Sequence, residues 1–238
     1  MQLAKKNQMK LSVIIPVYNE ERTLLEVVSK VKKVSLDKEI IIVNDGSTDR
    51  TAEIIETIKK HEKNPHIKIL QHEKNLGKGA AVRTGLNNAT GDIVLIQDAD
   101  LEYEPADYKK LIEPIINKGA SVVYGTRIFS LSKKDMHTLH YFGNKILTLI
   151  TNLLYGCKIS DMETCYKIFK KDVLKGITLR SRGFEFEPEI TAKLLKNGYK
   201  IYEVPIVFKP RTFDEGKKIT WRDGVKAVYY LIKYRFVD

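Results

Sequence analysis

The sequence predicts an α/β protein with a mostly parallel central sheet flanked by helices. From residue 11 to about residue 126, short apolar runs rich in Val and Ile alternate with amphipathic stretches of helical period. This alternation is typical of strands and helices that wind a parallel sheet. The run 40–43 is apolar at every position, as expected for a strand that is buried on both faces.

The elements follow in chain order. Strands are predicted at residues 11–17, 39–44, 67–71, 92–97 and 121–125. The helix after the first strand is predicted by the helical spacing of Leu24, Val27, Val28, Val31 and Val34. N-cap candidates for the next helix, which runs toward His61, are Ser47, Thr48 and Asp49. The last hundred residues predict a long helix at 137–155, a loop, a helix around 188–197, a strand at 200–208 and a helix from Trp221.

Composition limits the function classes. Lys and Arg total 41 against 30 Asp and Glu, for a formal charge of +11, which favours anionic partners or a basic solvated surface. The two cysteines, Cys157 and Cys165, are too few to form a disulfide framework. Residues 1–10 are polar and basic, and no apolar run approaches the roughly 18 residues of a membrane span. We therefore expect a cytoplasmic protein, soluble or peripheral at the membrane.

Polar residues follow three of the predicted strands, at the edge where open parallel sheets bind ligands. The first strand is followed by Pro16, Tyr18, Asn19 and Glu20, the second by Asn44, Asp45, Gly46 and Ser47, and the fourth by Asp98, Ala99 and Asp100. A single cluster of this kind could equally consist of residues that form turns or helix caps and bind no ligand. Three clusters at equivalent strand ends favour a ligand site.

Asp98, Asp100 and the nearby Glu102 are expected to form an unpaired anionic cluster. Mutual repulsion would make such a cluster unfavourable unless a cation neutralised it. Carboxylate oxygens suit Mg²⁺ or Mn²⁺, which share the oxygens of substrate phosphates. The residues 75–81, NLGKGAA, open a helix and either face a phosphate or pack closely against the sheet.

Several ordered segments carry a family resemblance: VIIPVYNE, IIIVNDGSTDRT, EKNLGKGAAVRTG, IQDADLEYEP, YGTR and EVPIVFKPRTFDEGKK. Together they resemble family 2 glycosyltransferases of the GT-A fold, and most closely the polyprenyl-phosphate or dolichyl-phosphate mannose and glucose synthases. The resemblance spans residues 11 to about 221. It implies one domain over residues 1–238, with a nucleotide-sugar-binding half at about 11–126 and an acceptor-facing half with C-terminal helices at about 127–238.

The resemblance also implies roles for individual residues. Pro16, Tyr18 and Glu20 would hold the nucleoside, and Val43 and Asp45 would contact the base. The metal and diphosphate would be bound by Asp98, Ala99, Asp100 and Glu102, and phosphate groups would be gripped by Arg127, Arg211 and Lys217. It implies an inverting transfer of a hexose from a donor of the GDP-mannose or UDP-glucose type to a lipid phosphate.

One departure concerns 161–166, where Cys165 occupies a position at which the family carries glycine. Asp161 and Glu163 in this segment are candidate bases for a sugar-hydroxyl acceptor. A lipid phosphate would need no base, because it is already largely ionised at neutral pH. Asp161 would then only orient the loop or the acceptor.

Basic and aromatic residues at 225–236, and the apolar stretch 146–155, suit either a core-packed helix or contact with an anionic membrane surface. A different class of function, a nucleotide- or nucleic-acid-binding module without catalysis, is disfavoured. The acidic site would repel a polyanion, and no nucleic-acid motif is present. The base, the sugar and the oligomeric state stay open.

Overall fold

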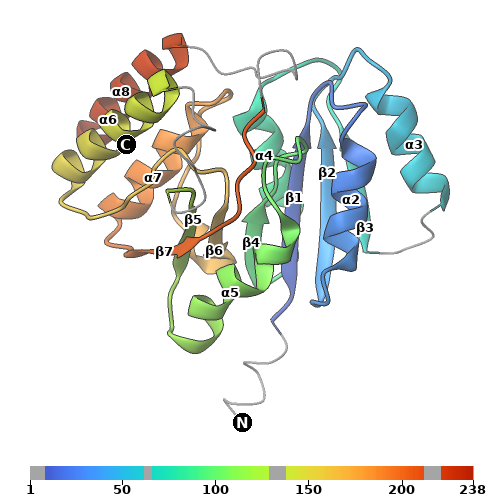
Figure 1. Cartoon of the computed structure of the whole chain (residues 1–238), viewed down its shortest axis with the longest axis horizontal. Coiled ribbons are helices and arrows are strands. Elements are labelled where there is room, and N and C mark those ends of the chain that lie inside the picture. The colour runs from blue at the N-terminus through green and yellow to red at the C-terminus, as the bar shows by residue number, and fades with distance from the viewer. Residues whose placement is uncertain (1–8, 62–65, 129–137, 212–220, 238) are drawn as a thin grey trace.

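The computed structural model describes residues 9–61, 66–128, 138–211 and 221–237. At its centre lies a seven-stranded sheet of order β3-β2-β1-β4-β6-β5-β7 (Figure 1). The strands are β1 (Leu11–Val17), β2 (Lys38–Asn44), β3 (Ile67–Gln71), β4 (Ile93–Ile96), β5 (Val122–Thr126), β6 (Lys167–Lys170) and β7 (Ile201–Pro205). All pairings are parallel except those of β6, which is antiparallel to β4 and β5. The predicted mostly parallel sheet is confirmed.

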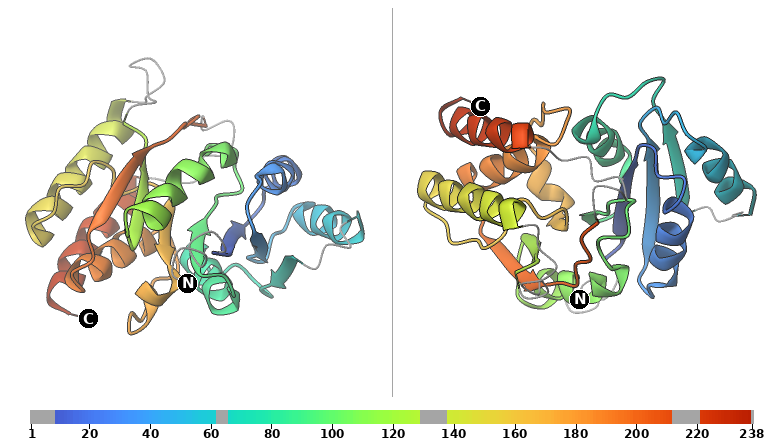
Figure 2. Two further views of the ribbon diagram at one scale, coloured as in Figure 1. Left: turned by 90° about the horizontal axis from the view of Figure 1, so that it is seen from below. Right: turned by 45° about the horizontal axis from the view of Figure 1, so that its top comes forward.

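Helices flank this sheet and extend beyond one of its ends. They are α2 (Leu24–Lys33), α3 (Thr51–His61), α4 (Lys78–Asn88), α5 (Tyr108–Asn117), α6 (Thr138–Tyr155), α7 (Phe186–Lys196) and α8 (Trp221–Phe236), with short 3₁₀ turns η1 (Pro105–Asp107) and η2 (Lys171–Leu174). Figure 1 shows α3 near the β3 end of the molecule and α6, α7 and α8 grouped at the opposite end. Figure 2 shows the same grouping from two further directions.

The core forms where the apolar strands are covered on both faces. Ile41, Ile42 and Val43 of β2 are fully buried, as the unbroken apolar run predicts. Helix α4 packs on β1 and β2, and its Gly85 faces Ile14 so closely that a Cβ at this position would overlap the Ile14 side chain. The glycine thus lets the helix approach the sheet.

Strand β6 was not predicted, because the sequence indicates a loop here. It has only four residues, and Lys167 at its start hides the apolar pattern. The Lys167 side chain is nevertheless completely buried, with its ammonium group 2.6 Å from the Glu187 carboxylate and 3.0 Å from the Met162 carbonyl. A buried charge is tolerated where an opposite charge and hydrogen bonds compensate its lost hydration.

The apolar stretch 146–155 lies in α6 and is buried on one side only. Leu147 is buried against α8 and Thr151 is also buried, whereas Leu149 and Leu153 are exposed. Within the four described ranges, no helix is both long and apolar enough to cross a bilayer.

Candidate functional site

The three polar clusters predicted at strand ends lie at one edge of the sheet. Strands β2, β1 and β4 are consecutive and parallel, so that Asp45, Glu20 and Asp98 follow neighbouring strand ends. Hydrogen bonds join the first two ends, since Asn19 N–H donates to Ser47 Oγ and Glu20 N–H to Thr51 Oγ1. The topology therefore brings residues distant in sequence into one site.

The acidic residues after β4 are paired with cations, contrary to the expected unpaired cluster. Asp98 lies 2.9 Å from the Lys78 ammonium group, and Asp100 lies 3.1 Å from the Arg211 guanidinium group. Glu102 accepts a hydrogen bond of 2.7 Å from the backbone N–H of Arg211. Lys78 and Arg211 thus neutralise part of the negative charge that was expected from the sequence to be neutralised by a metal ion. Both come from segments far from Asp98 in the chain, which is why the sequence did not reveal them.

The two aspartates differ in their affinity for a proton. Burial raises the pKa of Asp100 to about 7, and the neighbouring Asp98 and Glu102 carboxylates add to the rise. Burial also acts to raise the pKa of Asp98, but Lys78 outweighs it and the net shift is downward. Negative charge at Asp100 is therefore incompletely compensated by Arg211, and an added cation would relieve this.

The segment after β7 crosses the acidic residues, and Figure 1 shows it running from β7 toward the strand ends. Lys209 N–H donates to the Glu102 carbonyl, and Tyr103 forms an isolated bridge with Phe208. Arg211 bonds Glu20 as well, at 3.2 Å, and so links the ends of β1 and β4. Lys217, the other cation expected in this region, lies outside the described residues.

The nucleoside residues occupy different surroundings. Pro16 and Tyr18 are half-buried at the end of β1, whereas Val43 and Ala99 are buried. The Asp45 carboxylate accepts hydrogen bonds from His72 and from the backbone N–H groups of Leu76 and Gly77. Its side chain therefore fixes the loop before α4.

Most backbone N–H groups of the glycine-rich segment at the start of α4 are bonded within the protein and do not face a phosphate. Leu76 and Gly77 donate to Asp45, while Gly79 and Ala80 donate to the carbonyls of Gly183 and Arg182. Gly77 has φ of 97°, and a Cβ there would overlap the Arg182 carbonyl. The glycines of this segment therefore serve close packing, but against the loop before α7 and not against the sheet as expected.

Arg127 and Asp161 form a buried pair. The Arg127 Nε and Nη2 atoms each lie 2.6 Å from an Asp161 oxygen, and the Arg127 N–H adds a third bond of 3.1 Å. The guanidinium carbon lies 5.1 Å from the centre of the Phe208 ring. Glu203 of β7 accepts hydrogen bonds from the backbone N–H groups of Ser160 and Asp161, which positions the Asp161 loop.

A buried network of charges behind Asp98 was not predicted from the sequence. Lys78 contacts Asp98 and, at 3.2 Å, Glu187 of α7, and Glu187 in turn contacts Lys167. The only sequence signal is the charge of Glu187 between Phe186 and Pro188 in the first turn of α7, a turn that also holds Glu189.

Glu163 lies beside this network. Burial raises its pKa to about 7, because the lowering by Lys167 does not offset the loss of hydration. One of its oxygens, Oε1, is buried without a hydrogen-bond partner among the described residues. Glu163 is therefore a carboxyl group that can exchange a proton near neutral pH.

Cys165 replaces the expected glycine without distorting the loop. Among the described residues other than glycine, only Asn19 and Leu101 have positive φ, so the backbone at Cys165 is ordinary. The thiol is buried 3.5 Å from the Lys78 ammonium group, and burial raises its pKa well above its usual range. A protonated, buried thiol acts as a packing group.

The residues present fit a divalent cation bound jointly with substrate. Among the side chains that the structure describes, no three His, Cys, Asp or Glu groups converge on one point. Mg²⁺ commonly uses only one or two carboxylates and takes its remaining ligands from phosphate oxygens and water. Asp98 and Asp100 satisfy that requirement, while Glu102 anchors the segment at Arg211.

A family model described as glycosyl transferase family 2 matches residues 12–178. Two relatives with similar sequences act on dolichyl phosphate, according to their names. UDP-N-acetylglucosamine–dolichyl-phosphate N-acetylglucosaminyltransferase of Methanococcus voltae is 36% identical over 92% of this chain and 94% of its own length. Dolichol-phosphate mannosyltransferase of Pyrococcus furiosus is 33% identical over 95% of this chain, which spans 64% of that relative.

Similar folds occur among solved structures. Glucosyl-3-phosphoglycerate synthase of Mycobacterium tuberculosis, in complex with Mn²⁺, UDP and phosphoglyceric acid, superposes with a TM-score of 0.71 at 20% identity. The superposition covers 99% of this chain and 81% of the synthase. This likeness confirms the expected GT-A fold.

Proposed function

The chain belongs to glycosyl transferase family 2, and from that premise we propose that it transfers a hexose from a nucleoside-diphosphate sugar to a polyprenyl or dolichyl phosphate. The observation that carries the proposal is the charged group at the strand ends, where Arg211 links Glu20 to Asp100. The two dolichyl-phosphate enzymes at 36% and 33% identity support the acceptor class. We assign donor binding to residues 11–126 and acceptor binding to 127–238, within a single domain.

In the proposed reaction, an acceptor oxygen attacks the anomeric carbon, the bond to the nucleoside diphosphate breaks, and the configuration inverts. Asp98 and Asp100 would hold Mg²⁺ or Mn²⁺, which supplies charge stabilisation to the leaving diphosphate. Arg127, Arg211 and Lys217 would add fixed positive charge for phosphate oxygens. Pro16, Tyr18, Glu20, Val43 and Asp45 would shape the nucleoside site, with Asp45 acting through the loop that it holds.

The acceptor decides whether a base is needed. Asp161 bonds Arg127 through both carboxylate oxygens, so we assign it a positioning role. Glu163, with a pKa of about 7, is the candidate base if the acceptor is a sugar hydroxyl. Purified enzyme offered both acceptor types with labelled donors separates the two, since Glu163→Gln slows only transfer to a hydroxyl.

The donor is tested by thermal unfolding with a panel of nucleoside diphosphates, with and without Mn²⁺. A ligand that binds the native state raises the unfolding temperature by mass action. Cation-dependent preference for UDP or GDP identifies the donor class. If no nucleotide raised the unfolding temperature, and the protein bound RNA or DNA in a salt-sensitive manner, a non-catalytic binding module would be favoured instead.

Contact with an anionic membrane at the cytoplasmic face is the second part of the proposal. Helices α6 and α8 pack together, and each exposes an apolar stripe with helical spacing: Phe142, Ile146, Leu149 and Leu153 on α6, and Val225, Tyr229, Ile232 and Phe236 on α8. Basic residues of α8 accompany the stripes: Arg222, Lys226, Lys233 and Arg235. Apolar side chains next to cations match the interface of an anionic bilayer.

This second part is tested by vesicle sedimentation. Leu153→Glu, which places a charge in the exposed stripe of α6, should release the protein from anionic vesicles without lowering its unfolding temperature. If Leu153→Glu sedimented with anionic vesicles as the native protein does, the proposed membrane contact through this stripe would be wrong.

A further inference from the structure

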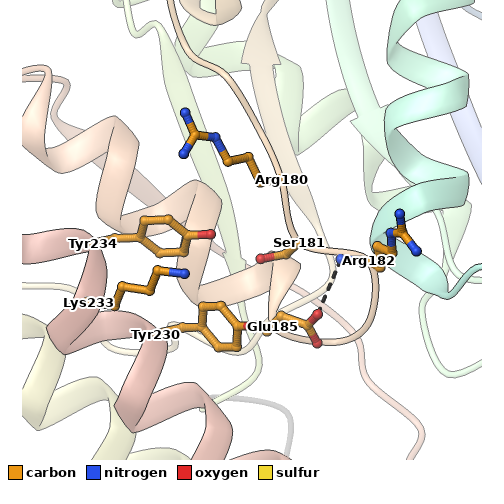
Figure 3. A pocket seen from close by; sticks show the side chains of 7 residues that line it. All are labelled: Arg180, Ser181, Arg182, Glu185, Tyr230, Lys233 and Tyr234. Atoms are coloured by element: carbon orange, nitrogen blue, oxygen red, sulfur yellow. Dashed lines mark hydrogen bonds between the residues drawn. The ribbon is translucent and has the colours of Figure 1, made fainter. Parts of the chain in front are cut away.

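A cavity of about 310 Å³ lies between α8 and the loop that precedes α7, away from the acidic residues after β4 (Figure 3). It is lined by Arg180, Ser181, Arg182, Glu185, Tyr230, Lys233 and Tyr234. None of these residues contacts Asp98 or Asp100 by a described hydrogen bond or ion pair, and none has a role in the transfer proposed above. The cavity therefore needs an explanation of its own.

The lining carries three cationic side chains and one carboxylate. The carboxylate, Glu185, is occupied by its own loop, because its Oε1 accepts hydrogen bonds from the N–H groups of Arg182 and Gly183. Lys233 lies over two aromatic rings, 5.4 Å from the centre of Tyr230 and 5.6 Å from that of Tyr234. Within the described part of the chain, no carboxylate lies within ion-pair distance of Lys233. The cavity thus has an excess of positive charge.

The walls are held in place before any ligand binds. The Tyr230 and Tyr234 rings stack, with centres 5.7 Å apart and planes 26° apart. On the opposite wall, the N–H groups of Arg180 and Ser181 both donate to the buried Glu189, at 2.8 and 2.7 Å. A preorganised site loses less conformational entropy when it binds.

Ser181 supplies a buried hydroxyl group. The residue is only 4% exposed, and its Oγ makes no hydrogen bond of ordinary geometry to a described residue, although the Tyr234 hydroxyl and the Glu189 carboxylate lie near it. Figure 3 shows this hydroxyl directed toward the side of the cavity formed by the tyrosines. Because an unsatisfied buried hydroxyl is costly, a ligand oxygen at this wall would be stabilising.

We propose that this cavity binds a phosphate group, carried by a lipid headgroup or by a soluble phosphate compound. Two arginines and a lysine match the charge of a phosphate, and guanidinium groups pair with its oxygens in a bidentate manner. The serine and tyrosine hydroxyls can donate to the remaining oxygens. On α8, Lys233 lies one turn after Tyr229, a member of the exposed apolar stripe, so the cavity lies beside that stripe. The lipid source rests on the membrane contact proposed above, but the phosphate site does not.

The test compares two lysines of the same helix. Lys233→Met removes a charge from the cavity and keeps the apolar part of the side chain, whereas Lys226→Met removes the same charge from an exposed position that does not line the cavity. Binding is measured by calorimetry with glycerol phosphate, and by sedimentation with phosphatidylcholine vesicles that contain phosphatidic acid. Lys233→Met should weaken glycerol phosphate binding by about tenfold, the size expected from one charge-assisted hydrogen bond, and Lys226→Met should leave it nearly unchanged. With vesicles, both variants lose one membrane-facing charge, so a headgroup in the cavity should make the loss in Lys233→Met the larger of the two.

Loss of glycerol phosphate binding alone identifies a soluble ligand, and loss of vesicle binding alone, or of both, identifies a headgroup. Equal losses in the two variants, or none in Lys233→Met, overturn the phosphate site. Arg182→Ala is a second variant, and unfolding temperatures show whether each variant is folded. Glycosyl transfer in detergent, without vesicles, should be unchanged in Lys233→Met, so that failure of this site and failure of the proposed transferase activity remain distinguishable.

Discussion

Arg127 and Asp161 meet side by side in a buried pair, with two hydrogen bonds of 2.6 Å between the guanidinium group and the carboxylate. The pair joins the end of β5 to the loop before β6, and Glu203 fixes that loop from β7. Asp161 is thereby committed to holding Arg127.

Asp161→Asn should therefore lower both stability and transfer. Removing one partner from a buried ion pair costs about 3–5 kcal/mol of unfolding free energy, because the other charge is left uncompensated. Urea unfolding measures this loss, and the transfer rate should fall for lipid-phosphate and hydroxyl acceptors alike. A selective loss with hydroxyl acceptors alone would instead show that Asp161 is a base.

Asp100→Ala tests the metal site. If Asp100 shares a cation with the donor diphosphate, the variant should lose transfer by about 100-fold or more, a loss typical for groups that stabilise transition-state charge. Thermal stabilisation by a nucleoside diphosphate should also become independent of Mn²⁺. Glu104→Gln is the control, since Glu104 follows the same strand but pairs with Lys30 at 3.1 Å. If Asp100→Ala transferred sugar at the same rate as the native enzyme, the proposed metal site would be wrong.

The sheet was predictable because its evidence is local. Runs of Val and Ile define β1 and β2 without reference to any partner, and the predicted ranges lie within one residue of the observed ones. Strand β6 escaped prediction because Lys167, which begins it, is a charged residue whose burial depends on an ion pair with Glu187, twenty positions further along the chain.

The site was predictable only in its carboxylates. Asp98 and Asp100 are recognisable in the sequence because they follow a buried strand. The cationic residues that pair with them are not recognisable in this way. Lys78 and Arg211 are ordinary basic residues in the sequence, and only the packing of α4 and of the segment after β7 brings them to the acidic residues. Ion pairs between distant segments are a property of tertiary structure.

Glu39→Gln should make the protein less stable at neutral pH. Burial acts to raise the pKa of Glu39, but hydrogen bonds from Ser12 and Thr90, and the charge of Lys10, lower it to about 2. Since the folded-state pKa lies below the ordinary value, the stabilisation is complete above about pH 4.5 and is lost as the pH falls toward 2.

Urea unfolding at several pH values measures this effect. At pH 7 the variant should lose about 1.5–3 kcal/mol of unfolding free energy, the usual value for hydrogen bonds to a charged group, and the difference should shrink toward pH 2. A difference that stayed constant with pH would mean that the loss arises from packing.

Glu163→Gln should have the opposite pH dependence. Burial raises the folded-state pKa of Glu163 to about 7, so the stabilisation from its protonated form is present below about pH 4.5 and is lost as the pH rises through 7. The amide stays neutral, and the variant should therefore gain unfolding temperature relative to the native protein at pH 8 but not at pH 4. If the variant and the native protein unfolded at the same temperature both at pH 4 and at pH 8, the Glu163 carboxyl group would be hydrated in the folded protein.

Gly77→Ala tests the close packing at the start of α4. Gly77 and Gly119 both have positive φ, of 97° and 71°, but a Cβ at Gly119 meets nothing within 4 Å, whereas one at Gly77 overlaps the Arg182 carbonyl. Gly119→Ala should therefore cost only the left-handed conformation, about 1–2 kcal/mol. Gly77→Ala should cost more than its control and should weaken nucleotide binding as well, because the loop held by Asp45 must move. Equal losses of unfolding free energy in the two variants would mean that the contact between this loop and Arg182 is loose.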